Sequence, residues 1–427
     1  MLDKAGRRTY NFPVFRAGYS LYVSDSPTKR AEPFLVRKTL SPAYLTAACC
    51  SGYYAMGLVI SLIGAGLEAF AGQLSTSPTA IGGSFFFFVG TASFFMLFVV
   101  GPLIDRFGQK PVLIAGSLFL SAAILLLTRA RSLSAACALM FLAGTGSAGL
   151  NGGVNTLINH LHKNNRSRAF NLSNIFFGLG AVTLPCLAGW LLKSGGLFNL
   201  LVITSALSLL PALLFSLGVF PPGAAVNDFR LGEAVRTLAN PLVALFALVI
   251  FFYTGLEASL GIWSRTAMVD SWKVSAPLDQ FILAGYWGAL ITGRLLAGTT
   301  FKDIPSHTLV LSCAIGSAAG LGAFLVAPSV YVAAGALWFS GLCFAPIFPS
   351  TMGSAGENLS GYTGTVFSLL IAVGVLGAVL LSTGVGKIAA SSSLNGAFRV
   401  ILASGVLMLT FQYLLRRRII FRLQRGG

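Results

Sequence analysis

Long apolar segments alternate with short polar connections along the chain from residue 41 onward. A helix needs roughly 20 mainly apolar residues to cross the hydrocarbon core of a bilayer. Twelve segments reach that length, so the pattern predicts twelve transmembrane helices. They lie near residues 43–72, 79–102, 110–129, 133–157, 168–192, 196–220, 241–266, 279–299, 307–327, 329–351, 362–388 and 396–415.

One polar connection in the middle of the chain is longer than the others and separates two sets of six predicted helices. We therefore expect an all-α integral membrane protein built of two pseudo-symmetric six-helix bundles. The expected parts are a cytosolic N-terminal arm at 1–40, bundles at 41–220 and 241–416, a cytosolic linker at 221–240 and a basic cytosolic tail at 417–427.

Composition and charge agree with a membrane protein. Hydrophobic residues make up 55% of the chain and charged residues only 10%, against roughly a quarter charged in soluble domains. The net charge of +17 comes from Lys and Arg that flank the apolar segments, with 22 of the 29 on one predicted side. This asymmetry predicts that both termini are cytosolic, in the plasma (inner) membrane, beside anionic lipid. It does not indicate nucleic-acid binding.

Two of the twelve acidic residues lie well inside predicted helices, Glu68 in the first and Glu257 in the seventh. A charged group at that depth costs about 2.5–3.5 kcal/mol on insertion scales and usually has a function. The segments Gly66–Gly72 and Gly255–Gly261 share five of seven residues at an offset of 189. We expect two pseudo-symmetric carboxyls that face one cavity and exchange a proton near neutral pH. The alternative is a structural carboxyl that is hydrogen-bonded between helices.

Amide side chains gather in the fourth and fifth predicted helices. Asn151 and Asn155 are four residues apart, and Asn171 and Asn174 are three apart, so each pair lies on one helix face. Amides donate and accept hydrogen bonds, which suits the hydroxyls of a solute. Hydrogen bonding between helices is the alternative. Aromatic candidates that could stack on a solute or fill space are Tyr253, Tyr286, Trp287 and Trp338.

The connection between the second and third predicted helices has the most specific pattern. It combines Gly101, Asp105, Arg106, Gly108 and Lys110 within ten residues. A small residue lets helices approach closely, and the charges can hold a turn at an anionic leaflet. The segment resembles signature motif A of the major facilitator superfamily, which implies a gate that breaks and forms again as two bundles rock.

Further segments resemble the fucose–galactose–glucose proton-symporter group of that superfamily. They are Asn151–Thr156, Leu172 with Phe176–Ala181, Tyr286–Gly288, Gly293–Gly298 and Ala345–Ser350. The resemblance implies a sugar permease with a central cavity. In that group the fourth helix carries an acidic residue where Asn151 stands here, which argues against proton coupling through this helix. We assign Arg294 to the gate.

The leading hypothesis is a secondary active transporter that moves a sugar or related polyhydroxylated solute by alternating access with protons. One alternative is an exporter of an amphiphilic, drug-like or lipid substrate, and another is a membrane sensor or scaffold that transports nothing. The chain has no clustered residues typical of a membrane enzyme. We expect no cofactor and no metal site, and a protein that functions as a monomer.

Overall fold

The computed structural model describes residues 42–76, 78–220, 239–274, 278–359, 363–391 and 394–425. These residues form helices and short connections, with no strand among them. Twelve helical segments of this part of the chain are long and apolar enough to cross a membrane. The predicted all-α class and the twelve predicted spans are therefore confirmed. The expected N-terminal arm and most of the expected linker lie outside the described residues.

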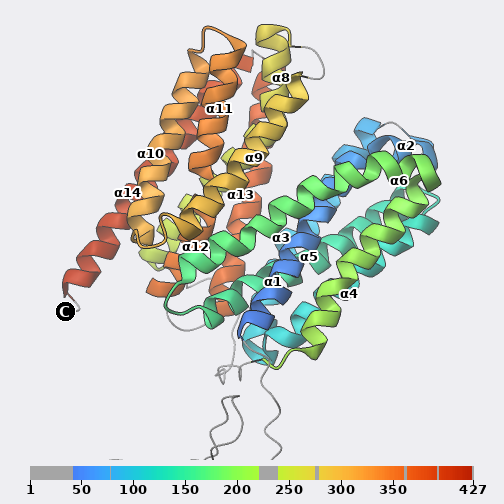
Figure 1. The fold of residues 1–427 in the computed structure, drawn as a ribbon, viewed down its shortest axis with the longest axis horizontal. Helices are drawn as coiled ribbons and strands as arrows, with labels where there is room; N and C mark the ends of the chain where they lie inside the picture. The colour runs from blue at the N-terminus through green and yellow to red at the C-terminus, as the bar shows by residue number, and fades with distance from the viewer. Residues whose placement is uncertain are drawn as a thin grey trace, which may run out of the picture. The chain divides into compact units, whose positions relative to one another are not determined.

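The first half of the described chain begins with a long helix, α1, and ends with the longest helix, α6. Its helices are α1 (Pro42–Ala65), α2 (Leu67–Leu74), α3 (Pro78–Phe107), α4 (Gln109–Leu126), the short 3₁₀ helix η1 (Leu127–Arg129), α5 (Leu133–Leu161) and α6 (Arg166–Leu217). Figure 1 shows these helices, coloured blue to green, gathered in one group.

The second half gathers into another group, coloured yellow to red in Figure 1. Its helices are α8 (Pro241–Trp272), α9 (Leu278–Thr299), α10 (Ser306–Leu325), α11 (Val330–Phe344), α12 (Ile347–Asn358), α13 (Thr363–Ser391) and α14 (Leu394–Arg425). The expected division into bundles at 41–220 and 241–416 stays a prediction.

Two of the predicted spans are each divided into two helices, and two others follow each other within one helical element. The first breaks at Gly66, so α1 ends at Ala65 and α2 follows as a separate helix. The tenth breaks at Ala345–Pro346, between α11 and α12, because proline cannot donate the backbone bond that would continue the helix. The fifth and sixth predicted spans form α6, with non-helical backbone at Gly195 and Gly196.

Local residue types explain several helix ends. Ser132 accepts a hydrogen bond from the Ala135 N–H at the start of α5, and Ser329 does the same for Val332 at the start of α11. The turn between α3 and α4 passes through Gly108 at a φ of 82°, a backbone region that favours glycine. The motif glycine is thus required by the shape of this turn.

The two halves touch near one end of the helices, which we call the motif end because it carries the turn at Gly108, and again farther along, where a methyl group on Gly178 of α6 would press on Ile291 of α9. Phe170 of α6 lies 6.0 Å from Phe367 of α13, measured between ring centroids. Asn171 donates from Nδ2 to Ser350 Oγ of α12 over 2.9 Å. A methyl group on Gly353 would overlap the backbone of Ser167, so α12 and α6 also touch here. The contacts at the motif end close the halves against each other within the first turns of α6.

Candidate functional site

A glutamate, a tyrosine and an arginine meet between α8 and α9. Tyr253 and Glu257 are four residues apart on one face of α8, and the Tyr253 hydroxyl donates to Glu257 Oε1 over 2.8 Å. Arg294 of α9 places Nη2 3.2 Å from the same oxygen. The arginine side chain is 7% exposed and the glutamate side chain 22% exposed. Solvent therefore reaches the carboxylate more readily than it reaches the guanidinium.

Arg294 also joins the two halves of the described chain. Its Nη1 donates to the backbone oxygen of Asn174 on α6 over 3.3 Å. One guanidinium therefore contacts a carboxylate of the second half and a carbonyl of the first. The sequence analysis assigned Arg294 to the gate and did not foresee its ion pair with Glu257.

The predicted amides of α5 form a short hydrogen-bonded chain that includes a residue the sequence analysis missed. Asn155 donates from Nδ2 to Asn151 Oδ1 over 2.7 Å, and its own Oδ1 accepts from the Tyr53 hydroxyl of α1 over 3.1 Å. Tyr53 also interacts with the Asn174 side chain and with the charge of Arg294. The position of Tyr53 inside an apolar predicted span is the sequence signal that could have identified this residue.

The two predicted amides of α6 have different environments. The Asn174 side chain is buried beside Tyr53, while its carbonyl binds Arg294. The Asn171 side chain lies instead in the contact between halves, with Ser350 as its partner. The structure thus places Asn174 with the ion pair and Asn171 at the closed motif end.

The four predicted aromatic residues separate into two groups. Tyr253 and Tyr286 are buried at the ion pair, and Trp287 lies against Tyr286 with ring centroids 5.6 Å apart. Trp338 is 41% exposed, and its indole donates to the Ile282 carbonyl of α9 over 2.8 Å. The structure therefore gives Trp338 a helix-to-helix contact and does not bring it to the other three.

Glu68 falls in α2, beyond the break at Gly66, and its side chain lies outside the described residues. The matching segment around Glu257 lies within the continuous helix α8. The repeated sequence thus adopts two different backbone arrangements. A role for Glu68 in proton coupling stays a prediction.

The motif residues occupy the turn at the motif end. Gly101 is buried in α3 and Asp105 is half-buried, whereas Arg106 is exposed and lies 5.2 Å from the Phe107 ring centroid. Lys110 donates from Nζ to the carbonyls of Ser216 and Gly218 at the end of α6, each over 2.9 Å. Both bonds stay within the first half, so Lys110 fastens α4 to α6 here.

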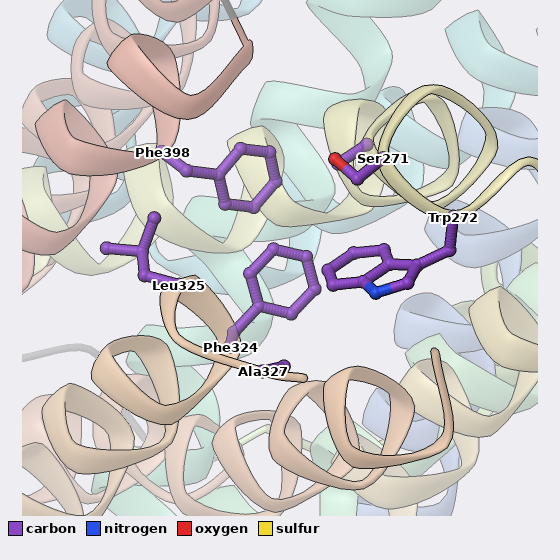
Figure 2. A pocket seen from close by; sticks show the side chains of 7 residues that line it. Ser271, Trp272, Phe324, Leu325, Ala327 and Phe398 are labelled. Atoms are coloured by element: carbon purple, nitrogen blue, oxygen red, sulfur yellow. The ribbon is translucent and has the colours of Figure 1, made fainter. Parts of the chain in front are cut away.

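A separate cavity of about 200 Å³ lies at the end of the second half away from the motif end. Figure 2 shows the rings of Trp272, Phe324 and Phe398 meeting around it, from α8, α10 and α14. Its remaining lining residues are Ala267, Ser271, Leu325 and Ala327. With no ionisable side chain in its lining, this cavity offers shape and apolar surface but no group for coupling to protons.

Metal-binding groups are not gathered in the part of the chain that the structure describes. No three or more His, Cys, Asp or Glu residues lie close enough there to hold a metal ion. The six cysteines are free thiols. The polar groups that do converge are those around Glu257 and Arg294.

Comparisons with known proteins agree with this arrangement. A family model described as Major Facilitator Superfamily matches residues 49–380. The fold is similar to that of the Escherichia coli fucose:proton symporter FucP, with 17% identity, a TM-score of 0.75, and 88% of this chain and 99% of that chain covered.

Two further solved structures are similar. The proton:xylose symporter XylE has 14% identity and a TM-score of 0.70, with 87% of this chain and 95% of that chain covered. The human organic anion transporter MFSD10 has 14% identity and a TM-score of 0.66, with coverage of 88% and 100%. A sequence search of curated proteins finds no match.

Proposed function

Because the chain belongs to the major facilitator superfamily, and so is a multi-pass membrane transporter and not an enzyme, we propose that it moves a small polar solute together with protons. The expected solute is a sugar or a related polyhydroxylated compound. Two similar structures are sugar:proton symporters that align with almost the whole chain, which supports this class. The polar side chains at the centre favour it over an amphiphilic substrate, which calls for mostly apolar walls.

The observation that carries the proposal is the group formed by Tyr253, Glu257 and Arg294, with its link to Asn174. A buried guanidinium is stable beside a carboxylate and unstable without one. Protonation of Glu257 removes the negative charge that holds Arg294. The arginine then needs another partner, and its bond to the first half changes at the same moment. A proton on one side chain is thereby linked to the contact between the halves.

The contacts between the halves support transport by alternating access. The closed contacts lie at the motif end, through Asn171, Ser350, Phe170 and Phe367. We propose that the bundles at 41–220 and 241–416 rock about the central group, and that these contacts open in the other state. Gly101, Asp105, Arg106, Gly108 and Lys110 shape and fasten the turn beside this gate.

The proposed orientation places the motif end in the cytosol. The charge asymmetry, with 22 of 29 Lys and Arg on that side, supports this orientation, with both termini in the cytosol. The membrane that we propose is the plasma (inner) membrane. The state described here would then be closed to the cytosol. A monomer contains every residue that the proposed mechanism uses.

The test is uptake into proteoliposomes that contain the full chain. Labelled fucose, xylose, glucose, galactose and their acid derivatives are supplied with and without an inward proton gradient. We expect at least one polyol to accumulate, and only when the gradient is present. Saturable efflux of an amphiphile without uptake of any polyol would contradict the proposal, as would a complete absence of saturable flux.

A further inference from the structure

We propose that the transported solute is a hydroxylated monocarboxylate, such as a sugar acid, whose carboxylate binds Arg294 when Glu257 is protonated. This inference rests on the proposed function and narrows its substrate class. The two can fail separately, because a neutral sugar would satisfy the broader proposal and contradict this one.

The first observation is that Arg294 is buried and has an unused donor. A guanidinium offers five N–H groups in a planar fork. Among the described residues, Nη1 binds the Asn174 carbonyl and Nη2 binds Glu257, while the buried Nε has no partner. Buried polar groups are nearly always paired. A free donor on a side chain that is only 7% exposed therefore indicates a ligand that is not present here.

The second observation is that the ion pair is incomplete. A carboxylate can bind arginine through two parallel hydrogen bonds of about 2.7–2.9 Å. Here a single contact of 3.2 Å joins Arg294 to Glu257 Oε1, and that oxygen also accepts from Tyr253. The ion pair therefore uses only part of the hydrogen-bonding capacity of the guanidinium, and a second carboxylate could use the rest in the two-bond arrangement.

A third observation is a second unpartnered donor beside the pair. The Tyr286 side chain is 0% exposed, and its hydroxyl has no partner among the described residues. It interacts with the charges of Glu257 and Arg294, so it belongs to the same group. A solute with a carboxylate and several hydroxyls offers acceptors for both Nε of Arg294 and the Tyr286 hydroxyl.

Charge balance selects the anion over the neutral sugar. With Glu257 ionised the central group is neutral, and with Glu257 protonated it carries one positive charge. The other titratable side chains placed around it are Tyr53, Tyr253 and Tyr286, with Cys49 and Cys50 near Tyr53. A monoanion restores neutrality, whereas a neutral sugar leaves a buried guanidinium without a counter-charge. Proton binding and anion binding therefore favour each other.

The proposed cycle moves no net charge. One proton on Glu257 and one carboxylate on Arg294 cross together, so an imposed membrane potential should not drive uptake. A neutral sugar that crosses with one proton carries one positive charge, so an inside-negative potential would drive its accumulation. The electrical signature thus separates the two substrate classes without any mutation.

The experiment compares matched probes in proteoliposomes of the full chain: D-glucuronate with D-glucose, and D-galacturonate with D-galactose. A proton gradient is applied with and without a valinomycin–potassium potential. We expect an acid to accumulate at least about tenfold more than its neutral partner, with an initial rate that the potential leaves unchanged. Potential-driven uptake of the neutral sugars alone would overturn this inference and leave the broader proposal standing. Uptake of no probe would overturn both.

Variants test the role of Arg294 directly. Arg294→Lys keeps the charge and loses the planar fork, so we expect the apparent affinity for the acid to fall about tenfold. Arg129→Gln, at an exposed arginine away from the site, is the matched control and should leave the apparent affinity for the acid unchanged. Because Arg294 variants could fold poorly, binding of D-glucuronate to purified Glu257→Gln provides a second readout. Its affinity should no longer depend on pH, and retention of the wild-type pH dependence would contradict the inference.

Discussion

The two halves of the described chain contribute different chemistry to the central group. The first half supplies neutral groups, namely the Tyr53 hydroxyl, the Asn155 amide and the Asn174 carbonyl. The second half supplies both charges, Glu257 and Arg294. Among the described residues, Arg294 forms its hydrogen bond to the first half with the backbone carbonyl of Asn174. We infer that the first half recognises polar groups of the solute, while the second half sets the charge state.

This chain also differs from the symporter group that its sequence resembles in the residue on its fourth helix. In that group an acidic residue stands on the fourth helix, where Asn151 is found here. Asn151 instead accepts from Asn155 within α5. We therefore expect the carboxylate that couples transport to protons to be Glu257 on α8, next to its arginine.

The largest effect that we expect from removing one charge of the second half is on the free energy of unfolding. Arg294→Gln leaves the Glu257 carboxylate without its counter-ion. We expect the free energy of unfolding to fall by about 3 kcal/mol. This value is at the lower end for buried pairs because the Glu257 side chain is 22% exposed. The double variant Arg294→Gln with Glu257→Gln removes both charges and should recover about half of that loss. Reversible unfolding in detergent measures both values.

The control for that pair is Arg129→Gln combined with Asp303→Asn, which removes two exposed charges away from the site. It should change the unfolding free energy by less than about 0.5 kcal/mol. If the double variant were less stable than Arg294→Gln alone, Glu257 and Arg294 would not act as a pair. That result would contradict the claim that the second half supplies a coupled pair of charges.

A smaller effect is expected in the first half. Asn155→Leu removes the acceptor of Tyr53 and the donor to Asn151, and one such bond between membrane helices contributes about 0.6 kcal/mol. We expect the free energy of unfolding to fall by about 1 kcal/mol. The apparent affinity for the solute should weaken, and the pH dependence of uptake should stay unchanged. Asn164→Leu, at an exposed loop asparagine, is the control. A shifted pH profile in Asn155→Leu would assign proton coupling to the first half as well.

Sequence reasoning found the spans because hydropathy and length alone determine whether a helix can cross a membrane. It also found Glu257, since a carboxylate inside an apolar span is visible without any knowledge of packing. The Arg294 partner could not be found in this way, because it depends on how α8 and α9 face each other. The break at Gly66 and the outward place of Trp338 likewise depend on neighbouring helices.

The repeated segment adopts different backbone arrangements in the two halves. The segments Gly66–Gly72 and Gly255–Gly261 are similar in sequence, yet the first begins a new helix and the second continues α8. In α8, the Thr254 hydroxyl donates to the Gly374 carbonyl of α13 over 2.6 Å beside Gly255. The seven matched residues therefore do not by themselves determine whether the helix continues.

The most direct test of the central claim separates coupling from transport in one variant. In proteoliposomes that contain Glu257→Gln, gradient-driven accumulation of the solute should fall at least about tenfold, because residue 257 no longer gains and loses a proton. Exchange of labelled for unlabelled solute across the same membranes should stay close to wild type, since exchange needs no net proton movement. Asp303→Asn, at an exposed carboxyl, should leave both unchanged. Accumulation in Glu257→Gln that still follows the proton gradient would contradict the account.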